Sequence, residues 1–405
     1  MLRKADQKME EYIEKDQQPT IGRKDHGYFL AAVFCFWFAI YIYAPVFGVY
    51  LQEIGFRFSA IGIILGAYGI TQILLRFPLG ILSDFLQKIR KQLFVGGFII
   101  ALISSLMLVY FESFALVLTA RLLAGITASM WVMATVLYSH YFSADRVSNA
   151  MGIMQFVTVA TQFFSMAVSG WLVHQFGWDF PFWVGAAASI LGAVFAWNIR
   201  EAKTDMSLPP KNAVHHITET VKIPHLKMLT FLSLVAHAVL FITIFGFSPI
   251  YAAALGVEEQ SFIWLTCAFF IPHAAASLSL VFYRLDPRFN KAVLAVCFIV
   301  TSAFLIAVPF SNTLASLSSV HFFIGLALGF IFPILLSEVV LVSPPAFKMS
   351  AMGFFQSFYA FGIFLGPLAA GVIAEQWNLD AVFTITGALC SATAILILLF
   401  LGIED

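Results

Sequence analysis

Charged side chains are scarce in this sequence. Asp, Glu, Lys and Arg make up 11% of its 405 residues, less than half of the roughly 25% found in an ordinary soluble domain. Hydrophobic residues make up 61%, and phenylalanine alone occurs 45 times. A water-soluble protein could not cover its surface with so few charges. The composition therefore predicts a chain that lies mainly in a lipid bilayer.

Other absences narrow the function. The net charge is zero, so the overall charge balance does not suggest the basic surface of a nucleic-acid-binding protein. Only four cysteines occur, far apart and inside apolar stretches, and this spacing fits neither a disulfide framework nor a zinc site. The sequence contains no Gly-x-x-x-x-Gly-Lys-Ser/Thr loop that would hold nucleotide phosphates. We expect no metal, no cofactor and no enzymatic activity.

Twelve apolar runs, separated by short polar breaks, are long enough to cross a membrane as helices. They fall near residues 28–51, 60–85, 93–110, 114–141, 150–173, 180–199, 228–254, 262–283, 292–309, 314–342, 350–374 and 381–401. We predict an all-α membrane protein whose twelve transmembrane helices form two pseudo-symmetric six-helix bundles. The predicted parts are a tail over 1–26, a first bundle over 27–199, a linker over 200–227 and a second bundle over 228–402.

Lysine and arginine gather at one end of these predicted helices. The tail, the linker and alternate loops carry nearly all of them, whereas the opposite loops carry only Arg57. Positive residues concentrate on the cytoplasmic side of membrane proteins. We therefore expect a multi-pass protein of the cell membrane with both ends of the chain in the cytoplasm.

The two halves of the sequence repeat each other. The triplet that begins at Ala150 recurs at Ala351, an offset of 201. Further pairs lie at similar offsets: Pro45 with Pro249, Asp84 with Asp286, Gly125 with Gly325, and Asp179 with Asp380. A six-helix unit repeated with the same polarity is related to its copy by an axis along the membrane normal. Such a pair of bundles leaves a cavity between them.

The loop between the second and third predicted helices carries Gly80-Ile-Leu-Ser-Asp84 followed by a basic cluster. The cluster consists of Lys88, Arg90 and Lys91. This pattern resembles that of the major facilitator superfamily, although Phe85 and Gln87 replace the family's usual basic residue and glycine. A small residue allows close helix approach, and an acid beside basic groups can form a latch that breaks when the bundles rock.

Two further patterns carry the resemblance. Arg121-x-x-x-Gly125 is similar to the family's membrane-embedded arginine motif, and its repeat partner reads His321-x-x-x-Gly325. The other pattern contains Gly362, Gly366, Pro367 and Gly371. The family's antiporters usually carry such a pattern in the fifth helix, where this chain has Ser165-Met166, so support for export is weaker. The resemblance implies alternating access by two bundles and a small-molecule substrate, and one chain already holds a complete two-bundle unit, so we expect a monomer.

Arg76 and Arg121 are the deepest permanent charges. Charged groups at membrane depth cost about 2.5–3.5 kcal/mol on insertion scales, so each is a functional candidate. Each arginine either binds an anionic group or responds to a proton; alternatively, Arg121 caps helix carbonyls and Arg76 extends to the interface. No carboxylate lies at mid-membrane in the first helix. We therefore expect the cavity to favour neutral or anionic amphiphiles over cations.

Proton coupling requires a group that titrates. The candidates among the histidines are His237, His273 and His321, with His321 favoured because it occupies the repeat position of Arg121. Asp84, Glu338 and Arg121 complete the set. His237 could instead simply pack among aromatic rings, and Glu338 could cap a helix end.

Polar side chains on the predicted helices are the candidates for lining the cavity. The set comprises Tyr41, Tyr43, Tyr68, Gln72, Arg76, Arg121, Gln162, His237, His273 and Tyr359. The alternative role of the tyrosines and amides is hydrogen bonding between helices.

These observations predict a secondary transporter that works by alternating access, driven by protons, and exports a small amphiphilic neutral or anionic compound. Its partners are then the substrate, protons and the bilayer. The alternatives are a proton-coupled importer of a small metabolite and a non-transporting membrane sensor of the same fold.

Overall fold

A computed structural model describes residues 21–82, 87–142, 147–201, 218–282, 285–344 and 347–400. Within these ranges twelve helical spans are long and apolar enough to cross a membrane. The predicted all-helical fold of twelve spans is confirmed. Helices suit this composition because lipid offers no hydrogen-bond partners to the backbone, and a helix satisfies its backbone hydrogen bonds within one segment.

The first six spans are built from eight helices. They are α2 (Arg23–Tyr41), α3 (Ala44–Glu53), α4 (Phe58–Leu82), α5 (Arg90–Tyr110), α6 (Phe114–Ser129), α7 (Trp131–Ser139), α8 (Val147–Phe176) and α9 (Phe180–Trp197). A short turn, η1 (Gln87–Ile89), precedes α5. The first span joins α2 to α3, and the fourth joins α6 to α7.

The second six spans follow the same order. They contain α11 (Leu226–Ile242), η3 (Thr243–Phe247), α12 (Ser248–Ala254), η4 (Glu259–Ser261), α13 (Phe262–Phe282), η5 (Pro287–Phe289), α14 (Asn290–Ala307), η6 (Val308–Phe310), α15 (Leu314–Val342), α16 (Lys348–Gln376) and α17 (Leu379–Phe400). The seventh span is continuous from α11 through η3 to α12.

The first and seventh spans break at equivalent places. Pro45 stands in the first turn of α3 and Pro249 in the first turn of α12. Proline lacks the N–H that would continue the preceding helix, so it starts a new segment. In the seventh span the five residues Thr243–Phe247 form a π-helical turn at this point. The repeat seen in the sequence therefore extends to the bend in each half.

Two equivalent turns close the helix pairs at the same end of the molecule. Gly55 follows α3 with φ 89°, and Gly256 follows α12 with φ 78°. Only glycine adopts this backbone region without a steric penalty. We call this the far end of the bundles, and we call the end where α2 begins and α9 finishes the linker end.

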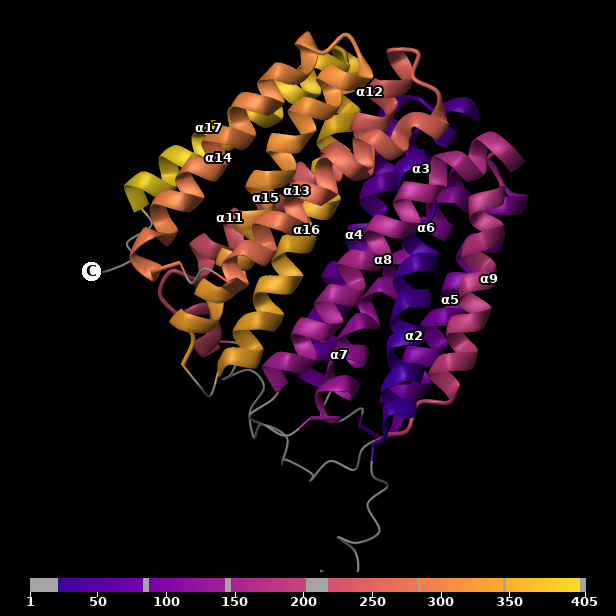
Figure 1. Cartoon of the computed structure of the whole chain (residues 1–405), viewed down its shortest axis with the longest axis vertical. Coiled ribbons are helices and arrows are strands. Elements are labelled where there is room, and N and C mark those ends of the chain that lie inside the picture. Colours follow the sequence, from indigo (N-terminus) through magenta and orange to yellow (C-terminus); the bar gives the residue numbers. More distant parts are fainter. Residues whose placement is uncertain are drawn as a thin grey trace, which may run out of the picture.

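The two sets of six spans lie side by side, with α4 and α8 facing α13 and α16 (Figure 1). Their closest approach lies toward the far end. A side chain at Gly62 would overlap the Pro367 carbonyl and Gly371, and one at Gly170 would overlap the Glu259 carbonyl. Glycine at these positions lets the backbones of the two bundles touch. The backbones of the two bundles are therefore in direct contact toward the far end, and we call this contact the seal.

Candidate functional site

Arg76 links the two bundles at their centre. Its side chain projects from α4 and is only 5% exposed. The Nη1 atom donates a 2.5 Å hydrogen bond to the hydroxyl of Tyr359 on α16, and the guanidinium lies 5.5 Å from the centre of that ring. The Nε atom is buried and has no hydrogen-bond partner. Part of the donor capacity of Arg76 is thus unused.

Tyr359 in turn packs on a histidine. The rings of Tyr359 and His237 are parallel, with centres 3.9 Å apart. His237 lies on α11, where its Nδ1 atom is 2.8 Å from the Ser233 carbonyl oxygen. Phe332 from α15 covers the same histidine, 4.6 Å between ring centres. Four helices from both bundles thus meet at this point.

Arg121 forms the second cationic centre. It projects from α6, is 5% exposed, and lies among three aromatic rings. Its guanidinium carbon is 4.5 Å from the centre of the Tyr68 ring, 5.4 Å from Phe47 and 6.0 Å from Tyr43. Nη1 reaches the Tyr43 hydroxyl at 3.5 Å, whereas Nε is buried without a partner. Ring faces attract a cation, but they do not neutralise its charge.

No carboxylate pairs with either arginine among the residues that the structure describes. The ion pairs in this part of the chain join Asp25 with Arg200, Glu219 with Lys222, and Asp286 with Arg288. All three lie at the linker end. The centre of the protein therefore carries two buried positive charges with no counter-charge of its own in the described part of the chain.

Polar side chains of tyrosine and glutamine lie between the two arginines. The Tyr41 hydroxyl interacts with the side chains of Tyr68 and Gln162. Gln72 is buried and donates to the Tyr68 carbonyl of its own helix at 2.8 Å. The charge of Arg76 acts on both Tyr41 and Tyr68. These predicted cavity residues thus come together in one place.

The second bundle packs phenylalanine rings against the tyrosines of this group. Phe245 lies 5.3 Å from Tyr41, and Phe241 lies 6.0 Å from Tyr68 in a stacked arrangement, between ring centres. The site therefore offers cationic groups on one side and apolar rings on the other.

His321 and Arg121 hold equivalent places in the two bundles. His321 is fully buried on α15; its Nδ1 lies 2.8 Å from the Leu317 carbonyl oxygen and its Nε2 lies 2.6 Å from the Ser248 hydroxyl. Ser248 begins α12, just as Tyr43, the partner of Arg121, precedes α3. Each bundle thus ties its fourth span to the break in its first span. Both ring nitrogens of His321 are occupied, which favours a tether over a proton carrier.

The remaining titratable candidates lie apart from this centre. His273 on α13 packs 5.8 Å from Phe269 and 5.9 Å from Phe332, and its buried Nδ1 has no partner. Glu338 is 4% exposed near the linker end of α15, where Asn290 donates a 2.5 Å hydrogen bond to it. Neither of them contacts Arg76 or Arg121 in any described interaction.

The predicted latch is only partly described. Asp84 lies outside the described residues, and Gly80 stands in the last turn of α4. Lys88 is exposed, Arg90 is buried and Lys91 is half-buried. Lys88 lies in η1, and Arg90 and Lys91 begin α5; all three are at the linker end.

The predicted helix-crossing glycines lie at close contacts. Within the bundles, Gly125 meets Tyr68 of α4, Gly325 meets Phe269 of α13, and Gly362 and Gly366 meet α11 at Leu234 and Ala238. Across the bundles, Gly371 and Pro367 meet Gly62. The glycines of α16 therefore serve both a bundle contact and the seal at the far end.

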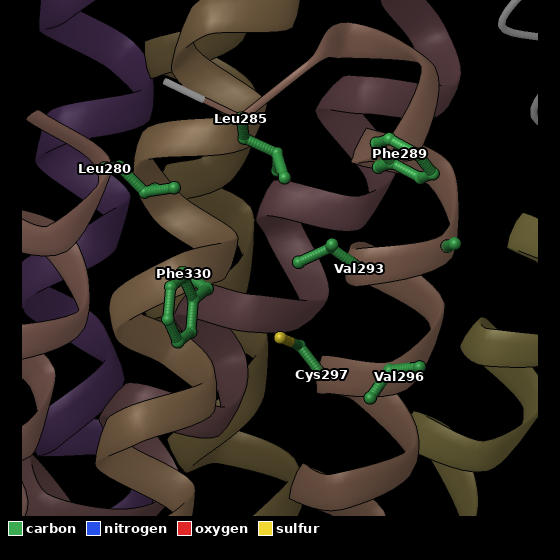
Figure 2. A pocket seen from close by; sticks show the side chains of 8 residues that line it. Leu280, Leu285, Phe289, Val293, Val296, Cys297 and Phe330 are labelled. Carbon is green, nitrogen blue, oxygen red and sulfur yellow. The ribbon is translucent and has the colours of Figure 1, made fainter. Parts of the chain in front are cut away.

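Two apolar hollows lie away from the arginines, on the outer side of the second bundle. One of about 480 Å³ is formed by α13, α14 and α15, with Val293, Cys297 and Phe330 pointing into it (Figure 2). The other, of about 610 Å³, lies between α13 and α15. The first opens where Phe289 and Val296 are more than half exposed. Neither hollow contains a charged side chain.

Sequence reasoning missed several contributors to the centre. Phe332, Ser233 and Phe364 were not candidates, because an apolar or small residue on an apolar helix carries no distinguishing signal. Phe364 packs against Gly66 and Gly69 at the bundle contact. The glycines of α4, spaced at intervals of four and three residues, were the available signal for that contact.

The comparisons with known proteins agree with this architecture. The sequence matches the Major Facilitator Superfamily over residues 29–256 and again over 229–405. The chain belongs to this superfamily. It is 24% identical to the inner membrane transport protein YajR of Escherichia coli, over 93% of this chain and 83% of that protein. It is also 24% identical to the proton-coupled antiporter flippase LtaA of Staphylococcus haemolyticus, over 74% of this chain and 75% of that protein.

A solved structure shows the same fold. The crystal structure of the nucleoside transporter NupG superposes with a TM-score of 0.72 at 17% identity, covering 93% of this chain and 99% of that one. The chain is thus a membrane transporter of this superfamily by its fold and its relatives. The superfamily includes carriers of chemically different substrates, so the substrate must be argued from the site.

Proposed function

We propose that this protein is a proton-coupled secondary transporter that carries a small amphiphilic anion through the centre between its two bundles. The observation that carries the proposal is the presence of Arg76 and Arg121, both buried and both without a carboxylate partner in the described chain. Each charge costs roughly 2.5–3.5 kcal/mol at membrane depth on insertion scales. A bound anion would offset part of that cost.

The surroundings favour an anion that also has an apolar part. Unused Nε donors on both arginines can bind an oxyanion, since charge-assisted hydrogen bonds are the strongest ones available. The rings of Phe241 and Phe245 offer an apolar surface to the rest of the molecule. A cation would meet two like charges, so the site discriminates against it.

The seal at the far end supports alternating access. Backbone contact at Gly62 and Gly371 closes that end, while His237 and Tyr359 remain only half-buried at the centre. We take the linker end as cytoplasmic because lysine and arginine gather there. The described state is then the one in which the centre is reached from the cytoplasm of a cell-membrane protein. Rocking about the α4–α16 contact would expose it to the other side.

Transport can be tested in proteoliposomes. The panel contains 2-naphthalenesulfonate and taurocholate as amphiphilic anions, uridine as a neutral compound and ethidium as a cation. We expect one of the anions to be moved in a way that depends on an imposed pH gradient. We also expect Arg121→Gln and Arg76→Gln to lose that flux, while Arg57→Gln, which removes an exposed charge at the far end, keeps it.

Two results would overturn the proposal. If ethidium moves faster than either anion, the charge argument is wrong. If the protein binds panel compounds but moves none of them under any gradient, the sensor alternative gains support. Neutral substrates and both directions of transport stay open alternatives to the sequence-based expectation of export.

A further inference from the structure

His237 occupies a distinctive position at the centre of the protein. It is the histidine whose ring stacks on Tyr359, the residue that holds Arg76 across the bundle contact. The charge of Arg76 acts on the His237 ring. A change of protonation at His237 would therefore be felt at a cationic centre of the proposed site.

The hydrogen bond of His237 indicates where a proton would bind. The Ser233 carbonyl oxygen can only accept, so Nδ1, at 2.8 Å from it, carries a hydrogen and donates. In the neutral ring Nε2 is then the free acceptor, and no described residue hydrogen-bonds to it. The side chain is only half-buried. An incoming proton would bind Nε2 without breaking an existing bond.

Few other charged or titratable groups surround His237 on the helices packed against it. From α4 it faces Arg76, from α16 Tyr359, and from α15 the uncharged Phe332. Glu338, also on α15, is directed instead to Asn290 of α14. His273 on α13 touches the other side of Phe332. Arg76 is thus the permanent charge, among the described residues, that acts on His237.

We propose that His237 takes up a proton together with the transported anion, so that the anion and the proton cross the membrane as an electroneutral pair. This inference rests on the proposed function. Without an anion, a protonated His237 and Arg76 would repel each other in a medium of low dielectric constant. An anion on Arg76 removes that repulsion and attracts the second positive charge. By linkage, the proton strengthens anion binding by the same factor.

The step balances in atoms and charge. A proton from the aqueous side binds the lone pair of Nε2, and the oxyanion takes the place of the Tyr359 hydroxyl on Arg76. No covalent bond of the substrate changes. On the other side of the membrane the anion leaves and the proton returns to water. Because both bind together, an inward proton gradient drives the anion inward, which favours import over export.

The test distinguishes transport driven by a pH gradient from transport driven by a membrane potential. The wild-type protein and His237→Gln are placed in proteoliposomes with 2-naphthalenesulfonate, whose sulfonate stays ionised across the neutral range. Either a pH gradient or a valinomycin-imposed potassium potential is applied. For the wild type we expect accumulation of about tenfold per pH unit, as one proton per anion requires, and no response to the potential. His237→Gln should lose the pH response and gain a response to the potential.

Controls keep the outcomes distinct. His174→Gln, which removes an exposed histidine at the far end, should behave like the wild type. The melting temperature of His237→Gln in detergent, compared with that of the wild type, shows whether the variant is folded. If that variant fails to fold, the wild-type protein can be tested alone. When the sulfonate is added to it in weakly buffered detergent solution, we expect the protein to take up about one proton per anion bound.

Each result decides one of the two claims. If the wild type neither binds nor moves the sulfonate, the proposed function and this inference both fail. If the wild type moves it but His237→Gln keeps the full pH response, or if binding takes up no proton, only the role of His237 is overturned. If His237 had a merely structural role, His237→Gln would lower activity, but it would not replace the response to the pH gradient with a response to the membrane potential.

Discussion

Arg76 of α4 donates a hydrogen bond to the hydroxyl of Tyr359 on α16, a residue 283 positions away in the sequence. This contact crosses from one six-helix bundle to the other at the level of the proposed site. An anion that binds Arg76 competes with the tyrosine for the same guanidinium. Under the proposed function, substrate binding and the contact between the bundles are coupled through this one side chain.

Tyr359→Phe tests this coupling. The variant keeps the ring that stacks on His237 but leaves Nη1 of Arg76 without its acceptor. We expect a loss of about 1–2 kcal/mol in stability, because a buried donor on a charged group loses its partner. Thermal unfolding in detergent measures it. A sulfonate anion should stabilise the variant more than the wild type; equal shifts for both proteins would argue against competition for Arg76.

Gly62→Leu tests the seal at the far end. A side chain there overlaps the Pro367 carbonyl and Gly371, so the two backbones must move apart. We expect the distance between spin labels at Glu53 and Glu258 to increase, in a chain whose four native cysteines are replaced. Gly96→Leu on α5 is the matched control, because a side chain at Gly96 meets open space. Unchanged label distances in Gly62→Leu would show that the seal does not depend on this crossing.

His321→Gln separates the tether from the proton carrier. Its Nδ1 and Nε2 are both occupied, by Leu317 and Ser248. We expect the variant to lose about 1 kcal/mol of stability and to keep the pH-gradient response of transport. Ser248→Ala should give a similar loss, and the double variant should lose less than the sum of the two. Loss of the pH response at unchanged stability would instead assign proton coupling to His321.

The contribution of the Asp286–Arg288 ion pair at the linker end to stability should depend on pH in a predictable direction. Side-chain and backbone hydrogen bonds from Arg288 lower the pKa of Asp286, the repeat partner of Asp84, below its ordinary 3.8. The stabilisation from this pair is present above the ordinary pKa and is lost as the pH falls through the lowered one. We expect the small difference in melting temperature between wild type and Arg288→Gln to be constant near neutral pH and to vanish in strong acid. A difference that grows on acidification would contradict this assignment.

The sequence predicts the spans and the repeat well because both depend on local composition. A run of about twenty apolar residues has few alternatives in lipid, and Pro45 and Pro249 mark the same break in each half. Arg76 and Arg121 stand out because charge at membrane depth is costly. The site could be predicted as far as these isolated charges.

The partners of those charges could not be predicted. The bond of Arg76 to Tyr359 depends on how two distant helices cross, and no pattern within either helix encodes the rotation of the other. The contacts of His321 could not be predicted from the sequence either. Its position opposite Arg121 in the repeat suggests proton chemistry, whereas the hydroxyl of Ser248 engages its second nitrogen. The long-range packing, rather than the residue type, separates a tether from a titrating group.

The most direct measurement is equilibrium binding of 2-naphthalenesulfonate and of ethidium to the purified protein, followed by tryptophan fluorescence. The wild type, Arg57→Gln and the double variant Arg76→Gln/Arg121→Gln are compared. We expect the wild type and Arg57→Gln to bind the sulfonate and not ethidium. We expect the double variant to lose sulfonate binding by at least about a hundredfold, because two charge-assisted contacts are removed. Equal sulfonate affinity in the double variant, or tighter binding of ethidium by the wild type, would contradict an anion site at the two buried arginines.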